Sequence, residues 1–113
     1  MTEVKILEPG EILAEIAARP LLAREQAQAG YLGQYVDWTL ILADVHRVTS
    51  GEVRLLLRRR ANEMRYVATN VALANYPWLT SLHNGSAVQL RGRIAAVDSR
   101  AIEIDAADVI RTT

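Results

Sequence analysis

Apolar residues recur at helical spacing in the first third of the chain. Ile12, Leu13 and Ile16 fall on one side of a first helix, and acidic residues fall on another side. Pro20 interrupts this helix and fits the first turn of a second one, which ends near Gly30. We therefore expect two short helices before the first strand.

The spacing changes to strict alternation after Gly33, which is the pattern of half-buried strands. The inward positions of a first strand are Val36, Trp38, Leu40 and Leu42. A loop over residues 48–51 leads to a second strand, whose inward positions are Val53, Leu55 and Leu57 and whose outward positions are Arg54, Leu56 and Arg58. These two strands are expected to form a hairpin, with Trp38 in the core rather than in a ligand site.

A third strand and a short helix follow the hairpin. The strand covers about Met64 to Val71, and its pattern leaves open which residues face inward. Pro77 can begin the short helix, and Trp78 beside it is expected to plug one end of the core. Tyr31 and Tyr35 are expected to pack between the helices and the sheet.

Two further strands complete the pattern. An Asn84-Gly85 turn precedes the fourth strand, whose inward positions are Val88, Leu90, Gly92 and Ile94 and whose outward positions are Gln89, Arg91 and Arg93. The glycine at position 92 indicates a bulge. The fifth strand alternates Ile102 and Ile104 with Glu103 and Asp105.

Three strands, a short helix and two more strands form the element order of the OB fold, a Greek-key barrel that binds oligonucleotides and oligosaccharides. We therefore predict a mainly β fold, a five-stranded OB-type barrel with a short helix between strands three and four. The barrel is expected to span residues 31–113, and residues 1–30 are expected to form a helical extension packed on it.

The second half of the chain resembles bacterial OB-fold domains of the tRNA-anticodon-binding-like type. In that group a short helix ending in glycine precedes a strand of the form V-x-L-x-G-x-I, followed by V-x-S and I-x-I. The matching positions here are Tyr76, Pro77, Trp78, Leu79, Leu82, Gly85, Val88, Leu90, Gly92, Ile94, Val97, Ile102, Ile104 and Ala106. The resemblance covers residues 31–111, and its motifs concern barrel geometry rather than activity.

The composition fits one small globular domain. The chain has 113 residues, of which 50% are hydrophobic and 23% are charged. The absence of cysteine excludes disulfides, a thiolate zinc site and a cysteine nucleophile, and it suits a reducing compartment. Because no leader pattern and no apolar run of about 20 residues is present, we expect a cytoplasmic protein with no membrane association.

Charge is distributed unevenly although the formal net charge is zero. Residues through Ser50 include four basic and seven acidic side chains, whereas those from Gly51 onward include nine basic and six acidic ones. Seven arginines lie between Gly51 and Arg93, where the acidic residues are only Glu52 and Glu63. Arginine favours planar, bidentate contacts with phosphate or carboxylate, so the second half is the expected place for an anionic ligand.

The resemblance implies a ligand face over the second and third strands, flanked by the loops after the first and fourth strands. The residues of this chain on that face are Arg54, Arg58, Arg60, Arg65 and Tyr66, with Arg47 and Arg100 in the loops. Nucleic-acid OB domains commonly stack bases on exposed aromatic side chains beside such cations. Tyr66 is the one aromatic residue expected there, and Arg91 and Arg93 are expected to split the basic surface around the barrel.

No catalytic or metal-binding pattern emerges from the sequence. His46 and His83 are isolated, and the pair Glu103 and Asp105 projects outward from one strand. The serines lack a nucleophile elbow and a phosphate-binding Gly-Lys-Ser/Thr loop. We therefore expect no enzyme activity, no metal and no cofactor.

Two functions remain open. The first is a binding module that engages an anionic ligand, single-stranded nucleic acid above all, through the arginines of the barrel face. The second is a domain for protein interaction or self-association, which would dock through residues 12–22 and through outward Leu56 and Ile41. The arginine cluster favours the first function, whereas a neutral net charge and a pI near 6.7 favour the second.

Overall fold

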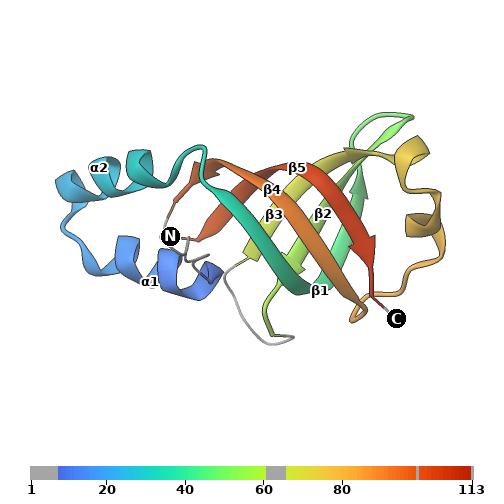
Figure 1. The fold of residues 1–113 in the computed structure, drawn as a ribbon, viewed down its shortest axis with the longest axis horizontal. Coiled ribbons are helices and arrows are strands. Elements are labelled where there is room, and N and C mark those ends of the chain that lie inside the picture. Colours follow the sequence, from blue (N-terminus) through green and yellow to red (C-terminus); the bar gives the residue numbers. More distant parts are fainter. Residues whose placement is uncertain (1–7, 61–65, 99, 113) are drawn as a thin grey trace, which may run out of the picture.

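The computed structural model describes residues 8–60, 66–98 and 100–112. A β-barrel forms the middle of the molecule, and helical segments lie at both of its ends (Figure 1). The elements in chain order are α1 (Pro9–Ala18), α2 (Leu21–Tyr31), β1 (Tyr35–Arg47), β2 (Glu52–Arg58), β3 (Tyr66–Ala72), the 3-10 helices η1 (Leu73–Asn75) and η2 (Pro77–Ser81), β4 (Ala87–Val97) and β5 (Ala101–Arg111). This order agrees with the one expected from the pattern.

The five strands close into a barrel in the order β1-β2-β3-β5-β4. The β3 and β5 strands pair in parallel, and every other neighbouring pair is antiparallel. Closure depends on the length of β1, because its first half pairs with β4, its second half pairs with β2, and Ile41 has a partner on both. This topology confirms the prediction of an OB-type barrel.

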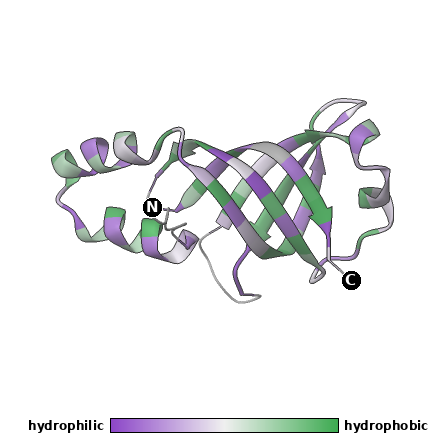
Figure 2. Ribbon diagram, in the orientation of Figure 1, coloured by the Kyte–Doolittle hydropathy of each residue, from purple (hydrophilic) through white to green (hydrophobic). Residues whose placement is uncertain are grey.

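Inward and outward residues alternate along the strands as their sequences predict (Figure 2). The inward positions of β1, β2 and β4 are buried, including Trp38 at 2% exposure. The structure also gives the register of β3, in which Val67, Thr69 and Val71 face inward. Thr69 is buried, and its hydroxyl donates to the carbonyl oxygen of Ile104 at 2.8 Å, which satisfies the polar group.

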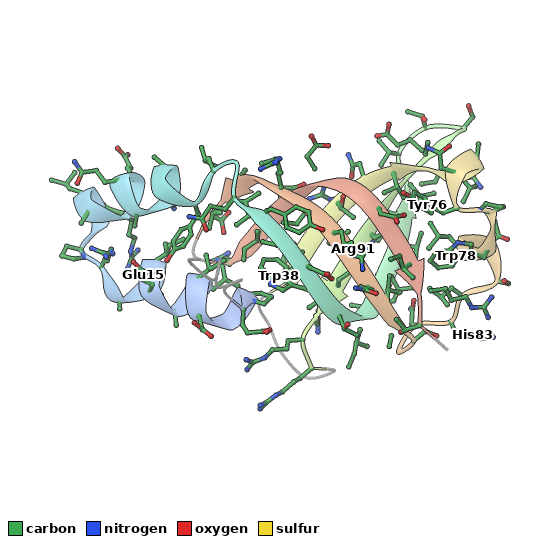
Figure 3. The ribbon with its side chains drawn as sticks, viewed as in Figure 1. Glu15, Trp38, Tyr76, Trp78, His83 and Arg91 are labelled. Atoms are coloured by element: carbon green, nitrogen blue, oxygen red, sulfur yellow. The ribbon has the colours of Figure 1, made fainter. Side chains whose placement is uncertain are left out.

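Different helices close the two ends of the barrel. Ile12, Leu13 and Ile16 of α1 are almost fully buried in the barrel core at one end. At the other end the buried residue of η2 is Leu79, while Trp78 packs against the core without being fully buried, so the prediction that Trp78 plugs the barrel holds only in part. Trp78 is only half-buried and packs edge-on against Tyr76, with 6.2 Å between ring centroids (Figure 3). A 3-10 helix has about three residues per turn, so the helical period does not decide which of two adjacent residues turns inward.

The two helices form a hairpin beyond the barrel. Tyr31 of α2 is buried, as predicted, and its hydroxyl donates to the carboxylate of Glu15 in α1. Tyr35 was expected to pack in the same place, but it is 46% exposed on the outside of β1, so that prediction is wrong. Its side chain points outward because it alternates with buried Val36.

One turn and one bulge shape the barrel as the glycines predict. Gly85 adopts a φ of +93°, which suits glycine in the tight turn before β4. The pairing of β4 with β5 shifts register between Arg91 and Gly92, which confirms the predicted bulge. In the described residues, no helix has the length and apolar character needed to cross a lipid bilayer.

Candidate functional site

The outward residues of β2, β3 and the first half of β5 form one continuous surface, which we call the β2–β3–β5 face. Strand pairing places Leu56, Ala68 and Glu103 side by side across the middle of this face. Near its end, Tyr66 at the start of β3 lies beside Ala101 of β5, and Arg58 is the last residue of β2. The face is the one on which the sequence placed most of its candidate ligand residues.

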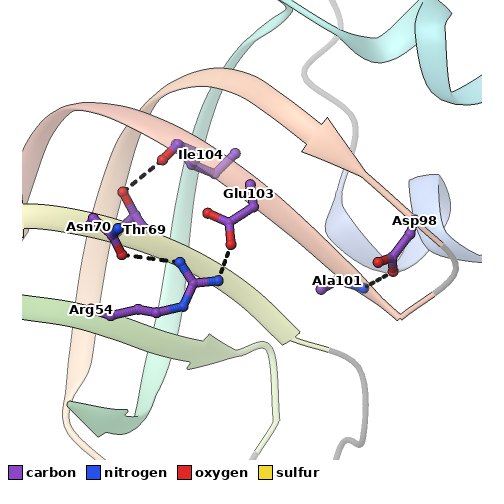
Figure 4. Close-up of polar contacts among 7 residues, drawn as sticks. All are labelled: Arg54, Thr69, Asn70, Asp98, Ala101, Glu103 and Ile104. Atoms are coloured by element: carbon purple, nitrogen blue, oxygen red, sulfur yellow. Dashed lines mark hydrogen bonds and ion pairs between the residues drawn. The ribbon is translucent and has the colours of Figure 1, made fainter. Parts of the chain in front are cut away.

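Arg54 crosses the middle of this face from β2 toward β5 (Figure 4). Its guanidinium donates to Oδ1 of Asn70 at 3.0 Å and forms an ion pair with the carboxylate of Glu103. Ala68, which lies between Leu56 and Glu103 on this face, is fully buried although it points outward. We call Arg54, Asn70 and Glu103 the central bridge.

The central bridge neutralises Arg54 within the protein itself. The side chains of Arg54 and Glu103 are 30% and 36% exposed, so solvent reaches the pair only in part. The hydrogen bond with Glu103 holds the pKa of Arg54 above its ordinary value. An ionised carboxylate therefore already occupies the position at which an anionic ligand would meet Arg54.

Three arginines and Tyr66 lie at the same end of the barrel, where β2 ends and β3 and β5 begin. The backbone N–H of Tyr66 donates to the carbonyl oxygen of Arg100 at 3.1 Å, so the start of β3 lies against the loop before β5. Arg60 and Arg100 are exposed, and no ion pair joins Arg58, Arg60 or Arg100 to any residue that the structure describes. We call these three arginines and Tyr66 the basic end.

The basic end has a fixed turn and one donor without a partner. Oδ1 of Asp98 accepts hydrogen bonds from the backbone N–H groups of Arg100, at 2.6 Å, and Ala101, at 2.8 Å, which fixes the turn between β4 and β5. Arg58 is partly buried, and its Nε has no hydrogen-bond partner in the described part of the protein. A buried donor without a partner favours an acceptor supplied from outside.

Arg47 and Arg65 complete the set of residues named from the sequence. Arg47 lies at the other end of the barrel, where its Nη1 donates to the carbonyl oxygen of Ser50 at 3.0 Å. It borders a hollow of about 400 Å³, lined with apolar side chains of β1, β2, η1 and η2. Arg65 lies outside the described residues. The structure thus brings Arg58, Arg60, Tyr66 and Arg100 together, gives Arg54 an internal partner and separates Arg47 from the others.

The opposite side of the barrel, formed by β1 and β4, is balanced in charge. Asp37 of β1 accepts hydrogen bonds from Gln89 at 2.8 Å and from Arg91 at 3.2 Å. Arg93 donates to the carbonyl oxygen of Gly33 at 2.9 Å. The basic residues are therefore divided between two sides of the barrel, as the sequence suggested, and those on the β1–β4 side are occupied.

Sequence reasoning missed Glu103 and Asn70 as members of the site. Glu103 was predicted to point outward, whereas the direction of Asn70 depended on the open register of the third strand. The contacts of both residues with Arg54 depend on the pairing of β3 with β2 and β5. A signal was available, because the OB element order implies the parallel pairing of β3 with β5. Among the described residues, no group of three His, Asp or Glu side chains comes together as a metal site would require.

The alternative docking surface is only partly exposed. The apolar side of α1 is buried against the barrel through Ile12, Leu13 and Ile16. The expectation that a partner docks on this part of residues 12–22 is therefore wrong. Leu56 and Ile41 are half-buried. Leu21 and Leu22 at the start of α2 are 74% and 85% exposed and remain available for contact.

The comparisons with known proteins support the fold. No protein-family description matches the chain, and no curated protein is similar to it in sequence. A lipoprotein from Klebsiella pneumoniae that is thought to bind nucleic acid matches in structure with a TM-score of 0.66 and 18% identity, over 95% of this chain and 92% of its own. The protein has an OB fold.

Two other solved structures share this barrel. An OBody, AM1L10, bound to hen egg-white lysozyme matches with a TM-score of 0.61 and 12% identity, over 76% of this chain and 85% of its own. The asparaginyl-tRNA synthetase of Pyrococcus horikoshii matches with a TM-score of 0.56 and 12% identity over 79% of this chain, which spans only 21% of that enzyme. At these identities the likeness concerns the barrel alone.

Proposed function

We propose that this protein is a non-catalytic OB-fold module that binds single-stranded nucleic acid at the basic end. The observation that carries this proposal is that Arg58, Arg60 and Arg100 lie at the same end of the barrel as Tyr66, with no ion pair to any described residue. The outward arginines of β1, β4 and the middle of β2 have polar partners within the protein, namely Arg47, Arg54, Arg91 and Arg93. The basic end is therefore the part of the surface with cations to offer.

Each component of the basic end has a role in such binding. The guanidinium groups would contact phosphates and displace their counterions, which makes the affinity depend on salt. The half-buried ring of Tyr66 would offer one edge or face to an unstacked base, and stacking tolerates any base. One aromatic residue and three cations suit a short site with little sequence preference.

We also propose that the barrel is an OB domain of the tRNA-anticodon-binding-like type. The similarity of the barrel to part of a tRNA synthetase and to a lipoprotein thought to bind nucleic acid supports it. RNA and DNA are both compatible with phosphate contacts and stacking. Parallel titrations with oligonucleotides of the two kinds would decide between them.

Fluorescence anisotropy of labelled 12-nucleotide single strands, at two salt concentrations, tests the proposal. Arg60→Glu and Arg100→Glu should each lower the affinity about tenfold, because each replaces a phosphate contact by repulsion. Arg111→Glu is the matched control, since Arg111 is an exposed arginine at the far end of β5. No binding at low salt, or an equal loss in all three variants, would refute the proposal.

A second candidate function is self-association through the helical hairpin. The observation that favours it is the exposure of Leu21 and Leu22, at 74% and 85%, at the start of α2. Light scattering after size exclusion should then show a dimer that Leu22→Glu converts to a monomer. A monomeric wild-type protein at high concentration would exclude this function without affecting the first.

A further inference from the structure

The central bridge and the basic end lie on the same face of the barrel. Arg54 and Arg58 both project outward from β2, and four residues of a strand span about 13 Å. A single strand bound at the basic end and running along this face would meet Arg54 next. At that point it would also meet Glu103, whose carboxylate repels phosphate.

We propose that Glu103 limits the nucleic-acid site to the basic end by holding Arg54 in the way that a phosphate would. This inference rests on the proposed function and adds to it the residue that sets the length of the site. The carboxylate is a built-in competitor, because it forms the same charge-assisted hydrogen bonds that a phosphate oxygen would form. Its removal would extend the site by one cation.

The geometry supports competition rather than a loose surface pair. Glu103 is fixed on β5, and the pairing of Ala68 with both Leu56 and Glu103 sets its distance from β2. Asn70 holds the other side of the guanidinium at 3.0 Å, so Arg54 is kept over β3 instead of extending into solvent. A ligand phosphate must displace a carboxylate that is always present at this position, whereas the basic end offers cations without that competition.

The number of phosphate contacts determines how steeply the affinity depends on salt. With Glu103→Gln, Arg54 keeps its position but loses its charged partner, so it becomes available to the ligand. For single strands, one additional contact makes the slope of log affinity against log salt steeper by about 0.7. The affinity at low salt should rise roughly fivefold to tenfold, which corresponds to the net free energy of about one hydrogen bond.

Three further variants separate this gain from a general change of charge. Asp105→Asn is the matched control, because it removes one negative charge from the same strand at an exposed residue paired across from Arg93. Arg54→Gln combined with Glu103→Gln should return the slope to the wild-type value. Glu103→Asp keeps the charge but shortens its reach, so it should give a smaller gain; it also serves as the test if Glu103→Gln fails to fold.

The outcomes distinguish this inference from the proposed function. A steeper slope in Glu103→Gln, absent from Asp105→Asn and from the double variant, is the expected result. An unchanged slope in Glu103→Gln, in a wild-type protein that does bind, would overturn the inference alone. A wild-type protein that binds no single strand at low salt would overturn the proposed function, and the inference with it.

Discussion

The middle and the end of the β2–β3–β5 face are built from the same strands but use their arginines differently. In the middle, Arg54 is held by Asn70 and Glu103 within the protein. At the end, Arg58 has an Nε without a hydrogen-bond partner among the described residues, and Arg60 is exposed. Both regions look equally basic in the sequence, so the arginines alone do not locate the candidate site.

The two regions use their arginines differently because different residues of β5 lie beside them. The short parallel pairing of β3 with β5 puts Glu103 beside Ala68 in the middle, and it puts Ala101 beside Tyr66 at the end. A carboxylate therefore lies next to the first region and a methyl group next to the second. We expect substitution of buried Ala68 in the middle to lower stability and substitutions at the end to weaken binding, whereas removal of the Glu103 charge should strengthen binding.

The largest expected effect is a loss of stability in the middle of the face. Ala68→Leu places a larger side chain beside Glu103 of the central bridge, where the alanine is fully buried. Overpacking of this kind should lower the free energy of unfolding by about 2 kcal/mol in urea denaturation. Ala72→Leu is the control, because Ala72 is an exposed alanine on the same side of the same strand. Equal stability of the two variants would show that the bridge does not enclose Ala68.

The next effect concerns binding at the end of the face. Tyr66→Ala should lower the affinity for a labelled single strand about tenfold through lost stacking, and Tyr66→Phe should retain the affinity because it keeps the ring. Tyr35→Ala removes an exposed tyrosine from the β1–β4 side and should leave the affinity unchanged. Similar anisotropy curves for Tyr66→Ala and Tyr35→Ala would argue against stacking at the basic end.

The barrel could be predicted from the sequence because the alternation of apolar and polar residues shows which side chains of a strand point inward. Val36, Leu40 and Leu55 are buried at the positions that their period requires. Alternation failed in β3, where Ala68 is outward and yet fully buried beneath neighbouring side chains. The pattern of β3 is ambiguous because an apolar residue, Ala68, points outward and a polar one, Thr69, points inward.

The candidate site could be predicted only as a list of residues. Arg54 and Glu103 are 49 positions apart, and their ion pair exists because β3 brings β2 and β5 within reach of each other. Alternation predicts the outward direction of each side chain separately, but it does not show which of them meet. For the same reason it could not show that Arg47 lies at the opposite end of the barrel from Arg60.

A smaller effect distinguishes the two regions by their response to salt. Arg60→Gln should weaken binding roughly fivefold at low salt and reduce the salt slope by about 0.7, because it removes one phosphate contact. The combined variant Arg54→Gln with Glu103→Gln removes an internal pair of charges and should leave the slope unchanged. Anisotropy titrations from low to moderate salt measure both. A reduced slope in the combined variant would mean that Arg54 contacts phosphate in the wild-type protein.

The smallest expected effect concerns the helical hairpin, where two polar side chains are partners within the protein. The Tyr31 hydroxyl donates to the Glu15 carboxylate. Burial, and then this hydrogen bond, raise the pKa of Tyr31 to about 12, whereas the hydrogen bonds from Tyr31 and Arg19 lower the pKa of Glu15. An unfolded tyrosine titrates near its ordinary value of 10.0, so the contribution of Tyr31 to stability is complete below that pH and is lost as the pH rises toward 12. The contribution of Glu15 has the opposite sign: it is complete above the ordinary value of 4.5 and is lost as the pH falls.

Tyr31→Phe should therefore lower the free energy of unfolding at neutral pH by about 0.5–1 kcal/mol, the net value of one hydrogen bond. It should also flatten the decline in stability between pH 10 and pH 12, because no phenol remains to titrate there. Binding to single strands should be unchanged, since Glu15 and Tyr31 belong to the hairpin rather than to the basic end. Urea denaturation at pH 7, 9 and 11 provides the measurement, and an equally steep decline above pH 10 in both proteins would assign that decline to tyrosines other than Tyr31.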